Sequence, residues 1–174
     1  DAMLAQDPAA RVACETMIST GFVQLAGEIT TTANVDFQKI VREKIRDIGY
    51  DHSDKGFDCD TCAVNISLDK QSPEIAQGVN VGEGDFKEMG ASDQGIMFGY
   101  AIRETDNYMP LTIDLSHKLA YRLSEVRKNG TLPLLRPDGK TQVSAQYIDG
   151  KVARIENIVV STQHAEEMTQ AQIK

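Results

Sequence analysis

Among the carboxylates of this 174-residue chain, those of two glutamates have the sequence surroundings that most suggest ligand binding. Glu15 and Glu28 each stand among apolar or small residues, within stretches of strand-forming composition. A carboxylate in such surroundings needs a cation or a hydrogen-bond donor, unless it reaches water at the end of a strand. The sequence alone leaves both interpretations open.

A glycine-rich segment, residues 69–95, is the second candidate and holds five of the chain's 13 glycines. Gly90 and Gly95 have the outer spacing of a phosphate-binding P-loop, but the Lys and Ser or Thr of that motif do not follow. The Gly-Glu-Gly at 82–84 lacks the third glycine of a dinucleotide fingerprint. What remains is a loop carrying Asp93, which serves either a ligand or a plain mobile connection.

The cysteines and the central aspartates carry weaker signals. Cys59 and Cys62 form a C-x-x-C pair, but a structural zinc site needs four ligands, and only Cys14 and three dispersed histidines remain. We interpret the spacing as incidental, with Cys62 an inward-facing strand residue. The aspartates between Asp51 and Asp60 lack the ligand pattern of a calcium loop and predict a solvated turn.

Composition excludes several classes of function. With 26 acidic and 18 basic residues the formal net charge is -8, which argues against nonspecific binding of nucleic acid. No apolar run approaches the ~20 residues that a membrane-spanning helix needs. Three cysteines cannot build a disulfide framework, and the first residues lack the layout of a signal peptide. We therefore expect a cytoplasmic protein with no membrane or nucleic-acid partner.

The first half of the chain predicts a β-β-α-β unit. Residues 12–19 and 22–29 are rich in strand formers around a Thr-Gly turn, which predicts a hairpin. Apolar residues at helical spacing over 37–48 predict a helix, with Asn34 as its N-cap. The alternation over 62–68 predicts a half-buried strand.

The second half uses similar ingredients. Residues 96–102 predict a strand, and Pro110 fits the first turn of a second helix. Residues 142–148 and 152–160 flank Asp-Gly and predict a hairpin. The whole pattern predicts an α+β fold of layered sheets and helices with loosely repeated β-β-α-β units.

A basic turn and the two ends of the chain complete the pattern. Residues 136–140, Arg-Pro-Asp-Gly-Lys, predict first of all a turn, and their positive charges suit phosphate. Residues 1–8 are typical of the last turn of a helix, and 169–172 spell a capping box for a helix that has barely begun. We therefore expect a fragment of a longer protein.

Short blocks spread over the chain occur in a characteristic order. They are Arg11–Thr16, Gly27–Thr30, Ile48–Tyr50, Lys70–Pro73, Ala91–Gly95, Met97–Tyr100, Arg127–Gly130, Leu135–Lys140 and Ser161–His164. In this order they resemble the S-adenosylmethionine synthetase (methionine adenosyltransferase) family. The resemblance implies a transferase of one-carbon metabolism that joins ATP and L-methionine, then cleaves the released triphosphate to pyrophosphate and phosphate. It also implies Mg²⁺ and K⁺ as cofactors, and a homodimer or homotetramer with active sites between subunits.

The resemblance also implies roles for residues in the first half of the chain. Glu15 matches the K⁺ ligand, and Glu28 and Gln71 match residues that hold methionine. Gln71 opens the mobile loop over about 71–95 that gates the site. Asp93 lies in the family's glycine-rich substrate-site block and is carried over as a catalytic residue.

In the second half the resemblance places ATP contacts at Asp138, Gly139 and Lys140, with Lys140 catalytic because it offsets charge on the leaving triphosphate. Ser92 stands where the family usually has glycine; if that position needs a positive φ, the change costs about 1 kcal/mol. The reaction itself needs alignment of the methionine sulfur with the ribose 5′ carbon, rather than a side-chain nucleophile.

By resemblance, residues 1–95 belong to the N-terminal domain and 96–174 to the central domain. The family's His-Pro-Asp-Lys block, with its ATP-contacting His and Mg²⁺-binding Asp, does not occur in this sequence. We therefore expect the chain alone to be inactive or nearly so. Two other hypotheses are a noncatalytic regulatory relative with the same fold and a generic nucleotide-binding module.

Overall fold

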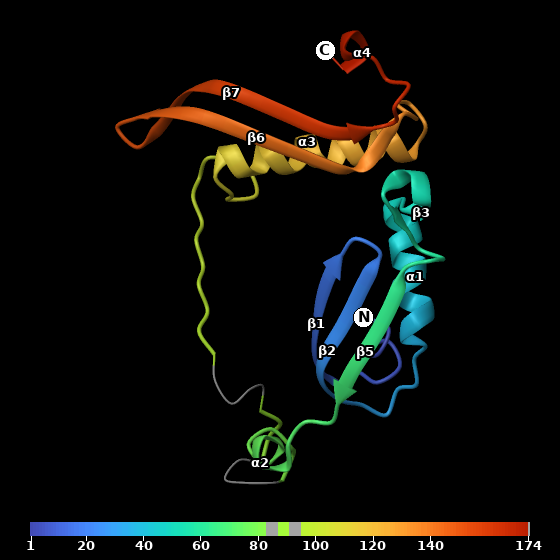
Figure 1. Ribbon diagram of the computed structural model, residues 1–174. Helices are drawn as coiled ribbons and strands as arrows, with labels where there is room; N and C mark the ends of the chain where they lie inside the picture. Colours follow the sequence, from blue (N-terminus) through green and yellow to red (C-terminus); the bar gives the residue numbers. More distant parts are fainter. Residues whose placement is uncertain (83–86, 91–94, 174) are drawn as a thin grey trace. The chain divides into compact units, whose positions relative to one another are not determined.

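The computed structural model describes residues 1–82, 87–90 and 95–173. It divides into two compact units (Figure 1): Asp1–Asp47 with Asp51–Met97, and Ile48–Tyr50 with Phe98–Lys174. Each unit contains its own sheet and its own main helix, which confirms the predicted α+β class. The exact position of the domain boundary stays a prediction.

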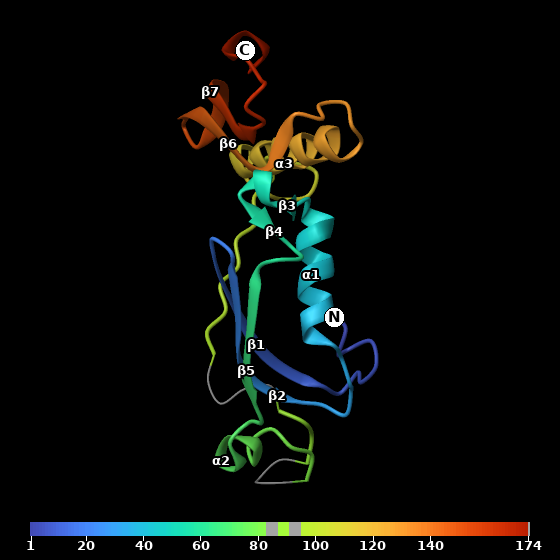
Figure 2. The same ribbon diagram turned by 45° about the vertical axis from the view of Figure 1, so that its right-hand side comes forward.

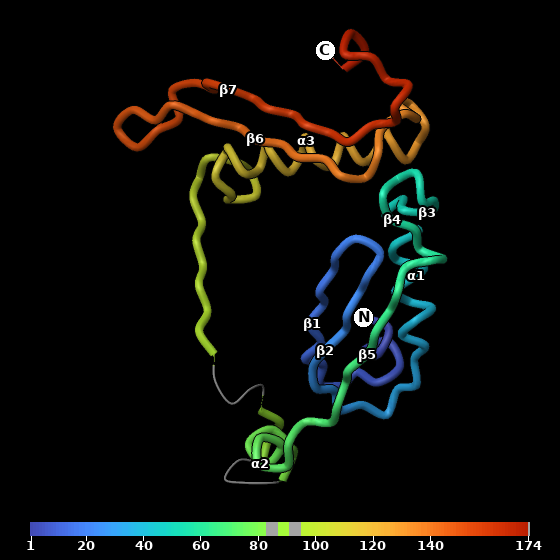
Figure 3. The backbone as a smooth tube through the Cα atoms, in the orientation of Figure 1, coloured from blue at the N-terminus to red at the C-terminus, as the bar shows by residue number. Residues whose placement is uncertain are grey.

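A three-stranded sheet organises the first unit (Figure 3). β1 (Arg11–Ser19) and β2 (Phe22–Thr30) form an antiparallel hairpin, and β5 (Ala63–Asp69) runs parallel to β2 along its other edge. Gly21 in the hairpin turn has a φ of 70°, which glycine adopts without the steric cost of a side chain. The predicted hairpin and third strand are confirmed.

Helix α1 (Phe37–Ile48) connects β2 to the rest of the unit and lies alongside the sheet (Figure 2). The Asp36 carboxylate accepts a hydrogen bond from Lys39 N at 3.0 Å, so Asp36 is the N-cap. The prediction of Asn34 was wrong, because it lies too far from the first turn; its own N–H donates to the Gln6 side chain at 3.3 Å.

The sheet has one buried face and one open face. Val23, Leu25 and Val64 are buried on one face, and Ile45 of α1 is buried with them. Residues paired across strands point to the same side of a sheet, and successive residues point to opposite sides. The intervening residues of β1 and β2, Glu15 and Glu28 among them, therefore share the open face.

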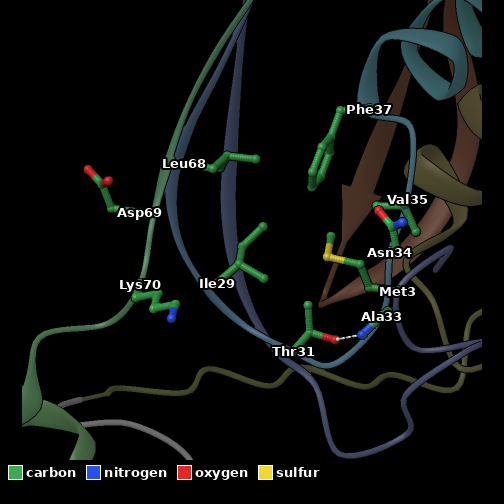
Figure 4. A pocket seen from close by; sticks show the side chains of 10 residues that line it. All are labelled: Met3, Ile29, Thr31, Ala33, Asn34, Val35, Phe37, Leu68, Asp69 and Lys70. Atoms are coloured by element: carbon green, nitrogen blue, oxygen red, sulfur yellow. Dashed lines mark hydrogen bonds between the residues drawn. The ribbon is translucent and has the colours of Figure 1, made fainter.

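A pocket of about 350 Å³ lies on the buried side, between the sheet and the start of α1 (Figure 4). Leu68 points into it toward Phe37. The Thr31 hydroxyl donates to Asp7 Oδ2 at 2.8 Å and accepts from Ala33 N at 3.0 Å. The hydroxyl is satisfied within the chain, so it needs no ligand.

Short elements follow α1 and β5. The Asp-rich segment forms a small hairpin of β3 (Asp51–His52) and β4 (Phe57–Asp58) around the 3-10 turn η1 (Ser53–Lys55). Helix α2 (Pro73–Ala76) comes after β5, and Ser72 Oγ caps it by accepting from Ile75 N at 3.4 Å.

The two cysteines of the C-x-x-C pair lie at the entrance to β5. Cys59 and Cys62 are buried and reduced, whereas Cys14 on β1 is half-buried. Arg42 of α1 donates to the Cys59 carbonyl at 2.7 Å, which ties the helix to this turn. Burial raises the pKa of the Cys59 thiol.

The second unit packs one long helix against a hairpin. Helix α3 (Leu111–Lys128) lies along β6 (Leu135–Ile148), which pairs with β7 (Lys151–His164); α4 (Gln170–Ile173) follows. Asp149 and Gly150, at φ 50° and 74°, form the tight turn, so the predicted helix and hairpin are confirmed. Among the described residues, no helix combines the length and apolarity needed to cross a membrane.

Two predictions for this region were wrong. Residues 96–102 form no strand, because no strand in the described parts of the chain pairs with them. Ile96, Met97 and Phe98 are 78%, 90% and 89% exposed. Residues 136–140 lie inside β6 rather than in a turn. The register shifts between Leu135 and Gly139, so a bulge accommodates Arg136, Pro137 and Asp138 while the strand continues.

Asp114 of α3 is a buried carboxylate that holds the preceding segment against the helix. Lys118 Nζ donates to it at 2.7 Å and Asn107 Nδ2 at 2.9 Å. These two donors hold the pKa of Asp114 below its usual value.

A substitution at Gly27 tests the sheet register. Gly27 has a φ of 144°, and an added Cβ would collide with the Ala13 carbonyl oxygen on β1. We expect Gly27→Ala to lower the free energy of unfolding by about 2 kcal/mol or more, measured by urea unfolding. Gly99→Ala is the matched control, because nothing lies within 4 Å of its added Cβ. Equal stability of the two variants would contradict the register.

The Asp114 cluster makes acid stability depend on one carboxylate. The pKa of Asp114 is lower in the folded state than in the unfolded state. The Asp114 carboxylate therefore stabilises the fold at pH values above the unfolded pKa of about 4, and this stabilisation is lost as the pH falls below that value. We expect Asp114→Asn to destabilise the protein at pH 7 and to differ less from the wild type near pH 3. Urea unfolding at both pH values measures this. A difference that does not shrink in acid would contradict the assignment.

Candidate functional site

A pocket of about 460 Å³ opens on the uncovered face of the first unit. It brings together Glu28 and Gln71, the two residues predicted to hold methionine. The other lining residues come from β1, β2, α2 and the segment near Gly90: Ala10, Arg11, Val12, Ala13, Thr30, Ile75, Met89 and Gly90. Charged and amide groups thus meet apolar side chains in one concave site, as small-molecule sites require.

Strand register explains this gathering. The β1–β2 pairing sets Ala13 opposite Glu28 and Arg11 opposite Thr30, so all four share the open face. β5 continues the arrangement because Asp69, its last residue, pairs with Glu28. The chain therefore leaves the sheet beside Glu28 and reaches Gln71 at the same edge.

The segment that closes the pocket is fixed by close backbone packing. Gly90 N donates to Val79 O at 3.0 Å, and Val79 is fully buried. A Cβ on Gly90 would come within 2.6 Å of the Gly78 carbonyl oxygen. Only glycine allows this approach, and it places Met89 at the pocket.

Two polar atoms of the pocket residues stay unpaired. Gln71 Oε1 and Arg11 Nε are both buried, and neither has a hydrogen-bond partner in the described structure. One is an acceptor and the other a donor, and each costs free energy when buried alone. The pocket therefore offers complementary groups to a polar ligand.

Glu15 lies on the same open face but does not line this pocket. It sits opposite Ala26 on β2, next to the Ala13–Glu28 pair, and it is exposed. No ion pair to it is seen in the described parts of the chain. The face thus carries two glutamates from adjacent strands.

The predicted ATP contacts lie in the second unit, at the bulged start of β6. Gly139 packs against α3, where an added Cβ would come within 2.6 Å of Leu123 Cδ2. Asp138 and Lys140 on either side of it are exposed. The strand therefore presents a carboxylate and an ammonium group to solvent, while the glycine lets the helix approach.

Tyr50 and Arg127 lie beside Asp138 within this unit. Burial raises the pKa of Tyr50; the negative charge of Asp138 raises it further, and Arg127 opposes the rise. A Cβ on Gly49, whose φ is 116°, would collide with the Arg127 guanidinium, so glycine is needed for this approach. Sequence reasoning did not assign these two residues a role, although both lie in blocks that carried the resemblance.

Family models cover most of the chain. One described as "S-adenosylmethionine synthetase, N-terminal domain" matches residues 1–73, and one described as "S-adenosylmethionine synthetase, central domain" matches residues 88–174. This chain belongs to the S-adenosylmethionine synthetase family. The recognition made from the sequence blocks is confirmed.

Several curated relatives carry the name S-adenosylmethionine synthase. That of Desulfosudis oleivorans is 56% identical over 174 residues, which is 100% of this chain and 45% of the relative. Those of Brachyspira hyodysenteriae and Clostridium tetani are 56% and 58% identical over 180 and 181 residues, again covering all of this chain and 46% of each relative. This chain thus spans less than half the length of these synthases.

Not every site residue expected from the synthetase family can be placed. Asp93 lies outside the described residues. Glu28 and Gln71 come together in the first unit, and Asp138, Gly139 and Lys140 come together in the second. Arg11 also lines the pocket and was not singled out from the sequence, although its spacing of two from Ala13 and four from Glu15 places all three on one strand face.

Titration of Tyr50 tests the environment of Asp138. We expect Asp138→Asn to lower the Tyr50 pKa and Arg127→Gln to raise it, because these substitutions remove the charges that act on it. Tyrosinate absorbance, with the Tyr50→Phe titration subtracted, measures both changes. Glu125→Gln on the same helix is the control. An unchanged pKa in both variants would place Asp138 and Arg127 away from Tyr50.

Proposed function

We propose that this chain is part of an enzyme that forms S-adenosylmethionine from ATP and L-methionine and cleaves the released triphosphate to pyrophosphate and phosphate. The observation that carries the proposal is the pocket shared by Glu28 and Gln71. Family resemblance assigns both to methionine, and strand register brings them to one edge of the sheet. The membership of the family supports the same activity.

Within this proposal Glu28 and Gln71 position methionine. A carboxylate and an amide oxygen both accept hydrogen bonds, so they suit the substrate ammonium group. Holding that group fixes the direction of the substrate sulfur, and such alignment is the main demand of a displacement at carbon. The apolar side chains of Ile75 and Met89 line the same pocket and suit the methionine side chain.

Asp138, Gly139 and Lys140 bind ATP in this proposal. Lys140 is exposed on β6, where its ammonium group is available to the leaving triphosphate. Asp93 stays proposed as a catalytic residue on family resemblance alone. Residues 1–95, with the loop over about 71–95, form part of the N-terminal domain, and 96–174 form part of the central domain.

K⁺ and Mg²⁺ are the proposed cofactors. Glu15 fits K⁺ as one ligand, because it offers an exposed carboxylate on the open face. Asp58, Cys59 and Asp60 form the metal-compatible group found in the described residues. This group does not fit Mg²⁺, which prefers oxygen ligands, and Asp60 is paired with Arg46. Mg²⁺ would neutralise triphosphate charge, and we assign no residue of this chain to it.

The remaining proposals follow from family resemblance. We propose a cytoplasmic homodimer or homotetramer with active sites between subunits, and no nucleic-acid or membrane partner. The chain alone is expected to be inactive, because the block assigned to Mg²⁺ does not occur in its sequence.

S-adenosylmethionine formation by the full-length protein that contains this chain tests the proposal. With ATP, methionine and Mg²⁺ we expect product, and we expect K⁺ to stimulate its formation. Glu15→Gln should abolish most of the stimulation, because it removes a charged cation ligand. Product is measured by chromatography with and without K⁺, and Glu43→Gln on α1, an exposed glutamate paired with Lys39, is the control.

The outcomes separate the competing hypotheses. Binding of ATP and methionine without product would favour a noncatalytic relative. ATP binding that is indifferent to methionine would favour a generic nucleotide-binding module. K⁺ stimulation retained in full by Glu15→Gln would remove Glu15 from the cation site while leaving the synthetase activity in place.

A further inference from the structure

We propose that Arg11 binds the α-carboxylate of the amino-acid substrate in the pocket of Glu28 and Gln71. The inference deepens the proposed function and rests on it. It assigns a specificity-determining residue to the site.

The first argument is the state of the Arg11 side chain. Its Nε is buried and has no hydrogen-bond acceptor in the described structure. No carboxylate in the described parts of the chain forms an ion pair with it. A guanidinium is always charged, and a buried donor without an acceptor costs free energy. An Arg with a purely structural role would be expected to have an acceptor within the fold.

The second argument is the arrangement of charge around the pocket. Arg11 is the one cationic side chain among the described residues that line it, whereas Glu28 and Gln71 Oε1 supply acceptors. A zwitterion carries an ammonium group and a carboxylate on the same carbon. The acceptors suit the ammonium group, and Arg11 supplies the positive charge that suits the carboxylate.

The third argument is position. Arg11 pairs with Thr30, two residues along β2 from Glu28, so both charged side chains project from the same face of adjacent strands. The apolar residues Ile75 and Met89 line the same pocket. Polar recognition of the backbone atoms of the ligand and apolar recognition of its side chain thus occur in one pocket.

The inference is tested by removing the substrate carboxylate and the Arg11 guanidinium, separately and together. The KM values for L-methionine and for L-methioninamide, whose carboxylate is replaced by a neutral amide, are measured with the full-length protein and its Arg11→Met variant. We expect Arg11→Met to raise the KM for methionine by about tenfold or more, since it removes a charge-assisted hydrogen bond. The KM for methioninamide should change by less than about threefold, and the KM for ATP by less than about twofold.

The control is Arg154→Met, because Arg154 is an exposed arginine of β7 that bonds Gln146 and Glu156. It should leave the preference for methionine over the amide unchanged. Arg11→Met would overturn the inference if it raised both KM values equally or neither. A merely structural role predicts that equal rise, because a distorted pocket does not distinguish a carboxylate from an amide.

Two further results keep the outcomes distinct. If Arg11→Met does not fold, Arg11→Lys replaces it; this variant keeps the charge without the Nε donor and should weaken the preference for methionine over the amide. An unchanged preference in a folded Arg11→Lys would then overturn the inference.

A wild-type protein that forms no S-adenosylmethionine would contradict the proposed function itself. An active wild type whose preference survives loss of Arg11 would defeat the role of Arg11 alone.

Discussion

The close approach of the Ala13 carbonyl to Gly27 sets the geometry on which the candidate site depends. It fixes β1 against β2, so Ala13 lies opposite Glu28 and Arg11 opposite Thr30. A slip of one residue would move the β1 side chains of the open face to the face covered by α1. The parallel pairing of β5 then brings the chain past Glu28 toward Gln71. The absence of a Cβ at Gly27 thus permits the strand register that brings these side chains together in the pocket.

Local sequence signals predicted the elements whose causes are local. The Asp149–Gly150 turn and helix α1 follow from backbone preference and apolar periodicity, and both are present. The predictions that failed concern segments whose structure depends on pairing with residues distant in the sequence. Residues 96–102 have strand composition, but no strand of the described residues pairs with them. The turn-forming sequence of 136–140 is overridden by the pairing of β6 with β7. The cap of α1 was misplaced by two residues, because two side chains of the cap type stand close together.

The candidate site was predictable to a different degree in each part. Glu28 and Gln71 were found through family blocks, and their meeting in one pocket follows from strand register, which the sequence does not reveal. Arg11 stands beside the recognised Glu15 block, but its importance depends on its unpaired Nε. That property depends on where the carboxylates of the described residues lie in the fold, which the sequence does not show. Tyr50 was missed for a similar reason, since its partners Arg127 and Asp138 lie far along the chain.

The three cysteine thiols differ in burial, and they therefore differ in reactivity toward alkylating reagents. Alkylating reagents attack the thiolate form, so the buried Cys59, with its raised pKa, and the buried Cys62 react slowly while the fold persists. Cys14 is half-buried and pairs with Gly27, on the side of the sheet opposite to Glu28. A fluorophore attached at Cys14 would therefore sit behind the pocket. It would report on ligand binding through the sheet without occupying the place of the ligand.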